Sequence, residues 1–219
     1  MSLRVEPFRF FARLTLRFIG HEKAKNAAEL LTHLKSVSDA SLYQHTHRFV
    51  ERHQFLVPEP ANDFAYWAGA MLGNESLAAA LGSVDPLRYS TWADLRAALV
   101  QAVAPFATDA TETTEDKVFR FLSARRWSVP TPHAASTFSE MAECLRRVGV
   151  DSLFLHVFEA RLRLPPGEND FSLWLTREWG RTDLARDCRV ESLTFKTLDD
   201  VRRELIRVFE KAEGGRAAA

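Results

Sequence analysis

The residues best suited to chemistry lie in the stretch "YQHTHRFVERH", which spans Tyr43–His53 and holds three histidines and one glutamate in a single predicted helix. His47 and Glu51 are four residues apart, a spacing that allows two side chains to share a metal ion. The apolar residues of this helix lie on the opposite face, so we expect His47 and Glu51 to be solvated. His53 lies among those apolar residues, where a core role is the simpler expectation.

His45 recurs in the second half of the chain as His156, at the end of the matching segments "SLYQH" and "SLFLH". The simplest interpretation is that each histidine is structural and hydrogen-bonds a neighbouring carbonyl. The alternative is a shared metal or acid–base site where the two halves meet, completed by Glu159 and Arg48. Because a guanidinium cannot ligate a metal, a symmetric two-metal centre is not expected. A single metal at His45 and His156, or a His–Glu pair opposite an anion-binding Arg48, remains open.

A second motif occurs twice, as "NDFAYW" at Asn62–Trp67 and as "NDFSLW" at Asn169–Trp174. Asparagine is a strong helix N-cap, and the negative charge of an aspartate in the first turn interacts favourably with the helix dipole. The phenylalanine and the tryptophan are three residues apart and share one helical face. The motif therefore predicts a capped helix start with two aromatic core residues. The alternative is a ligand site on the polar residues of both motifs, Asn62, Asp63, Asn169 and Asp170.

Other motifs that carry chemistry are missing from the sequence. It contains no G-x-G-x-x-G, no Walker loop, no H-E-x-x-H and no G-x-S-x-G, so no cofactor is recognisable. Arg9, Arg13 and Arg17 alternate along the first predicted strand and would project from one face. We expect that face to be solvated, with binding of a phosphate or acidic ligand as the alternative.

Both motifs belong to an internal duplication. Aligning Phe8 with Phe119 also aligns most later apolar positions, up to Leu99 with Leu205. The predicted organisation is a first repeat over residues 1–106, a polar, threonine-rich linker over 107–116, a second repeat over 117–213 and a frayed tail over 214–219. We expect the two repeats to pack as one globule.

Each repeat predicts a short strand followed by about five helices. Phe8–Phe18 alternates with a period of two, which is typical of a half-buried strand, and its counterpart begins at Phe119. Because a short strand is unstable alone, we expect the two strands to pair with each other or to share one small sheet. Asn26 and Ser136 are the expected N-caps of the first helices, and Ser41–His53 is expected to form one helix. The predicted fold class is α+β, predominantly helical and pseudo-twofold.

The combination of these segments resembles an uncharacterised prokaryotic family, a domain of unknown function. The segments that carry this resemblance are Phe8–Phe10, Ser41–His45, Glu59–Trp67, Glu159–Leu164 and Asn169–Trp174. The resemblance covers nearly the whole chain. It implies a small cytoplasmic protein and supplies no activity, cofactor or catalytic residue.

The composition narrows the possible functions. Lys plus Arg and Asp plus Glu are both 29, and this balance argues against nucleic-acid binding. No apolar run approaches the ~20 residues of a membrane span, and the N-terminus lacks the pattern of a signal peptide. Two cysteines are too few for a disulfide scaffold and suit a reducing cytoplasm. We expect a binding or accessory protein with a protein or small-molecule partner; the alternative is an enzyme or sensor that uses the histidine site.

Overall fold

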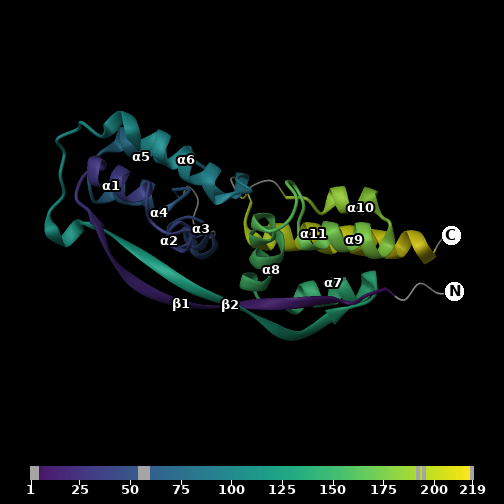
Figure 1. The fold of residues 1–219 in the computed structure, drawn as a ribbon. Coiled ribbons are helices and arrows are strands. Elements are labelled where there is room, and N and C mark those ends of the chain that lie inside the picture. Colours follow the sequence, from purple (N-terminus) through teal and green to yellow (C-terminus); the bar gives the residue numbers. More distant parts are fainter. Residues whose placement is uncertain (1–4, 54–59, 191–192, 194–195, 218–219) are drawn as a thin grey trace. The chain divides into compact units, whose positions relative to one another are not determined.

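The computed structural model describes residues 5–53, 60–190, 193 and 196–217 (Figure 1). Glu59, the first residue of one segment that carries the family resemblance, lies outside them. The chain forms two compact units: a terminal unit of residues 1–14 and 127–219, and a central unit of residues 15–126. The fold is α+β and mostly helical, as expected. No helix in the described ranges is long and apolar enough to cross a membrane.

The sheet has two strands, β1 (Phe8–Ala24) and β2 (Phe119–Ala135), which pair with each other as predicted. Each strand has 17 residues, so the expectation of short strands was wrong. The chain passes from one unit to the other inside the strands, after Leu14 in β1 and after Arg126 in β2. Each unit therefore contains part of both strands, and the compact units do not coincide with the two halves of the sequence.

Contacts between the strands define an antiparallel register. The Thr131 hydroxyl donates a hydrogen bond to the Phe10 carbonyl at 2.9 Å. Further along β1, a Cβ added to Gly20 would lie 2.6 Å from the carbonyl oxygen of Phe121, which precedes Thr131 on β2. Glycine at position 20 therefore allows the two backbones to approach closely.

In the central unit, the helices pack along one side of the two strands (Figure 1). Its helices are α1 (Ala27–Leu34), α2 (Asp39–His45), α3 (His47–His53), α4 (Asp63–Ala70), α5 (Glu75–Gly82) and α6 (Trp92–Val103), with short 3₁₀ turns at Pro86–Arg88, Ala104–Phe106 and Glu115–Lys117. Phe119 and Phe121 of β2 belong to the hydrophobic core of this unit, together with Phe64 and Trp67 of α4. The second half of the sequence thus supplies aromatic side chains to a core built mainly from the first half.

In the terminal unit, the two halves of the sequence exchange these roles. Its helices are α7 (Phe138–Arg147), α8 (Val150–Val157), α9 (Asp170–Trp179), α10 (Thr182–Asp187) and α11 (Leu198–Ala217), with a 3₁₀ turn at Glu159–Leu162. Phe8 and Phe10 of β1 are buried here. The Phe8 ring stacks on Phe171 with centroids 4.9 Å apart and meets Trp174 edge-on at 6.0 Å. The first half of the sequence therefore completes the core of a unit built mainly from the second half.

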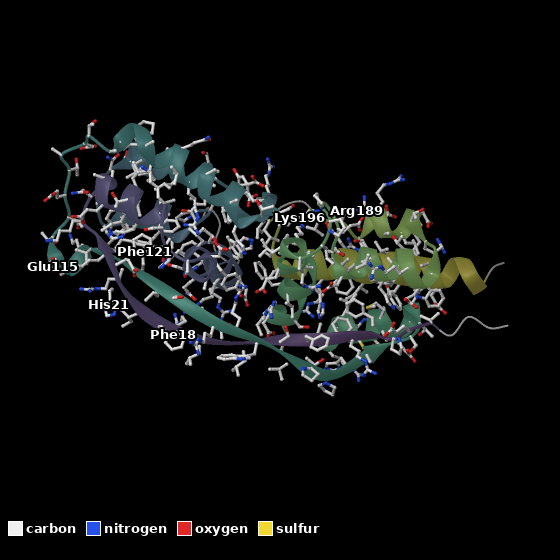
Figure 2. All side chains as sticks on the ribbon, viewed as in Figure 1. Phe18, His21, Glu115, Phe121, Arg189 and Lys196 are labelled. Carbon is white, nitrogen blue, oxygen red and sulfur yellow. The ribbon has the colours of Figure 1, made fainter. Side chains whose placement is uncertain are left out.

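The first strand is buried over a shorter length than its alternating pattern predicts. Phe8 and Phe10 are buried, but Leu14, Leu16 and Phe18 are exposed, by 60% in the case of Leu14. Beyond Leu14 the chain enters the central unit, where aromatic side chains of β2 already occupy the core. Figure 2 shows Phe121 on the helix side of the strands and Phe18 on the other side. A period of two identifies the strand, but it does not tell how far along the strand the core extends.

The helix expected over Ser41–His53 is broken. α2 ends at His45, and α3 begins at His47. At the break, the Thr46 hydroxyl donates to the Leu42 carbonyl at 2.6 Å, a side-chain bond that competes with the regular helix ladder. The break changes the rotation of the second segment, so His47 and Glu51 are buried and not solvated as expected.

Besides the break at Thr46, helix starts and ends differ from the sequence prediction at two further places. Asn26, Asn62 and Asn169 are N-caps, as predicted. In the second half, however, Thr137 caps α7 one residue after the predicted Ser136. α11 continues to Ala217, past the point where fraying was expected, because extending an existing helix costs far less than starting one.

The polar stretch over residues 107–116 is held against the central unit. The Thr113 N–H donates to the Lys25 carbonyl at 2.9 Å, and the Asn26 amide donates to Glu112 at 2.8 Å. Glu115 forms ion pairs with both Lys23 and Lys25. A composition typical of a free linker therefore belongs here to a segment with specific contacts.

The buried tryptophans generate the first prediction. Trp67 is 3% exposed, and its indole N–H donates to the Lys117 carbonyl at 2.8 Å. We expect Trp67→Ala to lower the free energy of unfolding by about 3–5 kcal/mol, the usual cost of truncating a core aromatic residue. Urea denaturation measures this loss. Trp127→Ala, at a 46% exposed position on β2, is the matched control and should cost much less; equal losses would contradict the prediction.

Candidate functional site

The best-defined polar constellation in the central unit is centred on His45. Its Nδ1 lies 2.6 Å from the Asp63 carboxylate, and its Nε2 accepts the backbone N–H of Leu122 in β2 at 2.8 Å. The imidazole is 1% exposed and packs against Phe119. Because Nε2 accepts a hydrogen bond, the ring is neutral and carries its proton on Nδ1, which donates to Asp63.

The terminal unit contains the same arrangement. His156 Nδ1 lies 2.6 Å from the Asp170 carboxylate, and its Nε2 accepts the backbone N–H of Phe11 in β1 at 2.9 Å. One contact differs, because Arg163 also donates to Asp170 at 2.5 Å. We call each set a histidine anchor: His45 with Asp63 and Leu122, and His156 with Asp170 and Phe11.

Each histidine anchor ties a strand to two helices and uses both ring nitrogens. His45 lies at the end of α2 and Asp63 at the start of α4, while the accepted N–H belongs to β2. A general base or a metal ligand needs the lone pair on Nε2. In both anchors this lone pair already accepts a hydrogen bond from a backbone N–H. The partners of each imidazole are a backbone N–H and a carboxylate, where a carbonyl was expected.

Burial and hydrogen bonding act in opposite directions on Asp170. Burial alone would raise the pKa of its carboxyl group, because a buried charge is poorly solvated. The hydrogen bonds from His156 and Arg163 outweigh this effect, so the pKa lies below its ordinary value of 3.8. Asp170 is therefore held as a carboxylate, ready to accept the Nδ1 proton.

The other residues of the expected histidine site have different partners. The buried Glu159 carboxylate accepts a hydrogen bond from Arg13 at 2.8 Å, and Arg13 also donates to the Ser128 hydroxyl at 2.6 Å. Arg48 forms an ion pair with Glu51 at 2.5 Å. Within the part of the chain that the structure describes, no group of three or more His, Cys, Asp or Glu side chains could hold a metal ion.

The asparagines of the repeated motif use their amides inside the fold. Asn62 Oδ1 accepts the Ala65 N–H at 3.0 Å, and its Nδ2 donates to the Leu81 carbonyl at 2.9 Å. Asn169 caps α9 in the same way and donates to the Cys188 carbonyl at 2.7 Å. Both asparagines are buried, and these bonds engage their amides within the fold.

The two cysteines are poor nucleophile candidates. Both are free thiols. Burial raises the pKa of the Cys188 thiol to about 12, and burial also raises that of Cys144. A reactive cysteine needs a lowered pKa, so neither residue is suited to thiolate chemistry at neutral pH.

A pocket opens beside each histidine anchor. The central pocket has a volume of about 390 Å³ and is lined by Arg17, Gln44, Arg48, Phe49, Arg52, His53, Asp63, Tyr66 and Leu122. The terminal pocket has a volume of about 470 Å³, and its lining includes Phe11, Ser128, Leu155, His156, Arg163, Asp170 and Leu173. Many lining positions correspond in the sequence alignment of the two halves.

Sequence reasoning missed several of these residues. Gln44, Arg52 and Tyr66 were not recognised, and the aspartates were not linked to the histidines. The available signal was that His45 and Asp63 recur together as His156 and Asp170. Two polar residues that recur as a pair in both halves are more informative than either residue alone.

Comparisons with known proteins identify relatives but no activity. Residues 5–210 match a family model described as a family of unknown function (DUF5752). The chain is similar to the structure of OrfY from Thermoproteus tenax, with a TM-score of 0.77 and 25% sequence identity, over 97% of this chain and 98% of that chain. No curated protein matches the sequence.

The histidine anchor makes a prediction about tautomers. Nitrogen NMR of labelled protein at neutral pH should show His45 and His156 protonated on Nδ1 only. A coupling across the hydrogen bond should link each Nε2 to the backbone nitrogen of Leu122 or Phe11. His53, whose Nδ1 bonds the Phe49 carbonyl, serves as the control and should show no such coupling. A proton on Nε2 of His45 or His156 would contradict the anchor.

The lowered pKa of Asp170 predicts a pH-dependent contribution to stability. A carboxyl group whose pKa is lower in the folded protein stabilises the fold above the unfolded value, and the stabilisation is lost as the pH falls through the folded value. We therefore expect Asp170→Asn to be less stable than the wild type at neutral pH, with the difference shrinking below about pH 3.8. Urea denaturation at several pH values tests this; a difference independent of pH would contradict it.

Proposed function

We propose that this chain, which belongs to the DUF5752 family of unknown function, is a binding or accessory protein in which both histidine anchors are structural. The observation that carries the proposal is the occupied Nε2 of His45 and of His156, each of which accepts a backbone N–H. These bonds remove the best candidate bases from acid–base chemistry. What remains open to a ligand is the pocket beside each anchor.

We further propose that the two halves of the sequence, residues 1–106 and 117–213, are copies of one ancestral repeat. Three sets of contacts at aligned positions support this. The Trp67 indole donates to the Lys117 carbonyl and the Trp174 indole to the Glu6 carbonyl. Nη1 of Arg96 donates to the Leu34 carbonyl, and Nη1 of Arg202 donates to the Leu145 carbonyl. The histidine anchors form the third set.

The proposed partner is a protein or a small molecule, and the proposed location is the cytoplasm. Two free thiols suit a reducing compartment. A formal net charge of zero gives no general attraction to nucleic acid.

An enzyme or sensor is the second candidate. An aspartate orients each imidazole, as in many acid–base pairs, and His156 lines the terminal pocket. Such a role would require the Phe11 N–H to leave Nε2 during turnover.

Native mass spectrometry of freshly purified protein, together with elemental analysis, separates the two candidates. We expect a co-purifying small molecule and no stoichiometric metal. A stoichiometric metal that is lost in both His45→Gln and His156→Gln would overturn the proposal and support the histidine-based alternative. Circular dichroism of both variants checks that they fold.

A further inference from the structure

The central pocket carries unpaired positive charge. Arg17 of β1 and Arg52 of α3 line it, and among the described residues neither guanidinium has a hydrogen-bond or ion-pair partner. Asp63, the acidic residue of this lining, is already engaged by His45 at 2.6 Å. Arg48 is balanced by Glu51. Because His45 is neutral, the Asp63 carboxylate keeps its charge. The wall therefore presents two guanidinium groups without a direct ion-pair partner and a net excess of one positive charge.

The terminal pocket provides an internal comparison. Ser128 stands at the position aligned with Arg17, and Arg163 at the position aligned with Arg52. Arg163 is neutralised by Asp170, whereas the matching aspartate of the central unit leaves Arg52 unpaired. Glu6 and Glu178 also line the terminal pocket, as do Arg9 and Arg177, so its three arginines are matched by three acidic residues. The excess of positive charge is thus a property of the central pocket and does not follow from the shared scaffold.

A buried amide in the wall has unused hydrogen-bonding capacity. Gln44 lines the central pocket and is 6% exposed, and within the described part of the chain its Oε1 has no hydrogen-bond partner. A buried polar atom without a partner is costly, and such atoms often mark the place of a missing water or ligand. The aligned residue in the terminal pocket is Leu155, which has no such requirement.

We propose that the central pocket binds a small phosphomonoester or inorganic phosphate through Arg17 and Arg52, an assignment that rests on the proposed binding function. Guanidinium groups bind phosphate oxygens through paired, charge-assisted hydrogen bonds. A donor of the ligand, such as a hydroxyl group, would satisfy Gln44. The volume of about 390 Å³ suits a small molecule, and Phe49, Tyr66 and Leu122 supply apolar wall.

Isothermal titration calorimetry with inorganic phosphate at constant ionic strength tests the assignment. We expect saturable binding of one phosphate per chain and a loss of affinity of at least about tenfold in R17Q/R52Q, or about 1.4 kcal/mol. Q44L, which installs the residue of the aligned position, should lower the affinity less. Arg17 and Arg52 are exposed, so the double variant should fold normally, which thermal unfolding verifies.

The matched control is R120Q/R186Q, which also removes one exposed strand arginine and one exposed helix arginine but lies outside both pockets. It should bind phosphate as the wild type does. An equal loss in the control, the absence of saturable binding, or tighter binding of malonate than of phosphate would overturn the assignment. If phosphate fails but another small molecule co-purifies, only the ligand class is wrong. If neither binds, the proposed binding function fails as well.

Discussion

The hydrogen bond from a strand N–H to a buried imidazole is the interaction on which both units depend. A pair of β-strands is marginal in water when nothing packs against it, and its outer edges leave N–H groups without partners. Leu122 and Phe11 place such groups against His45 and His156. The aspartate behind each ring keeps the proton on Nδ1, so that Nε2 remains an acceptor. Without that carboxylate, the tautomer that accepts the strand would lose its stabilising partner.

The position of the histidine anchors explains why aromatic side chains cross between the sequence halves. Once β2 is attached to α2 and α4, Phe119 and Phe121 lie against the helices of the central unit. Once β1 is attached to α8 and α9, Phe8 and Phe10 lie against those of the terminal unit. Each core thus needs residues from the other half of the sequence, and neither half contains a complete unit.

The two pockets lie beside matching histidine anchors but are lined by different residues. The histidine, the aspartate and the strand N–H are present beside both pockets. Several of the surrounding residues differ: Arg17 lines one pocket where Ser128 lines the other. Differences between aligned lining residues therefore point to function more directly than the residues that recur.

The sequence by itself determined the features that depend on near neighbours: the helical content, the asparagine N-caps, the apolar helix face that carries Trp67 and Trp174, and the presence of two strands. Caps and periodicity depend on residues within a few positions of each other, so they can be read locally. Only the tertiary structure decided where Leu14 leaves the core, how Thr46 turns His47 inward, and which strand N–H each histidine accepts. These features depend on contacts between residues far apart in the chain, which local patterns do not encode.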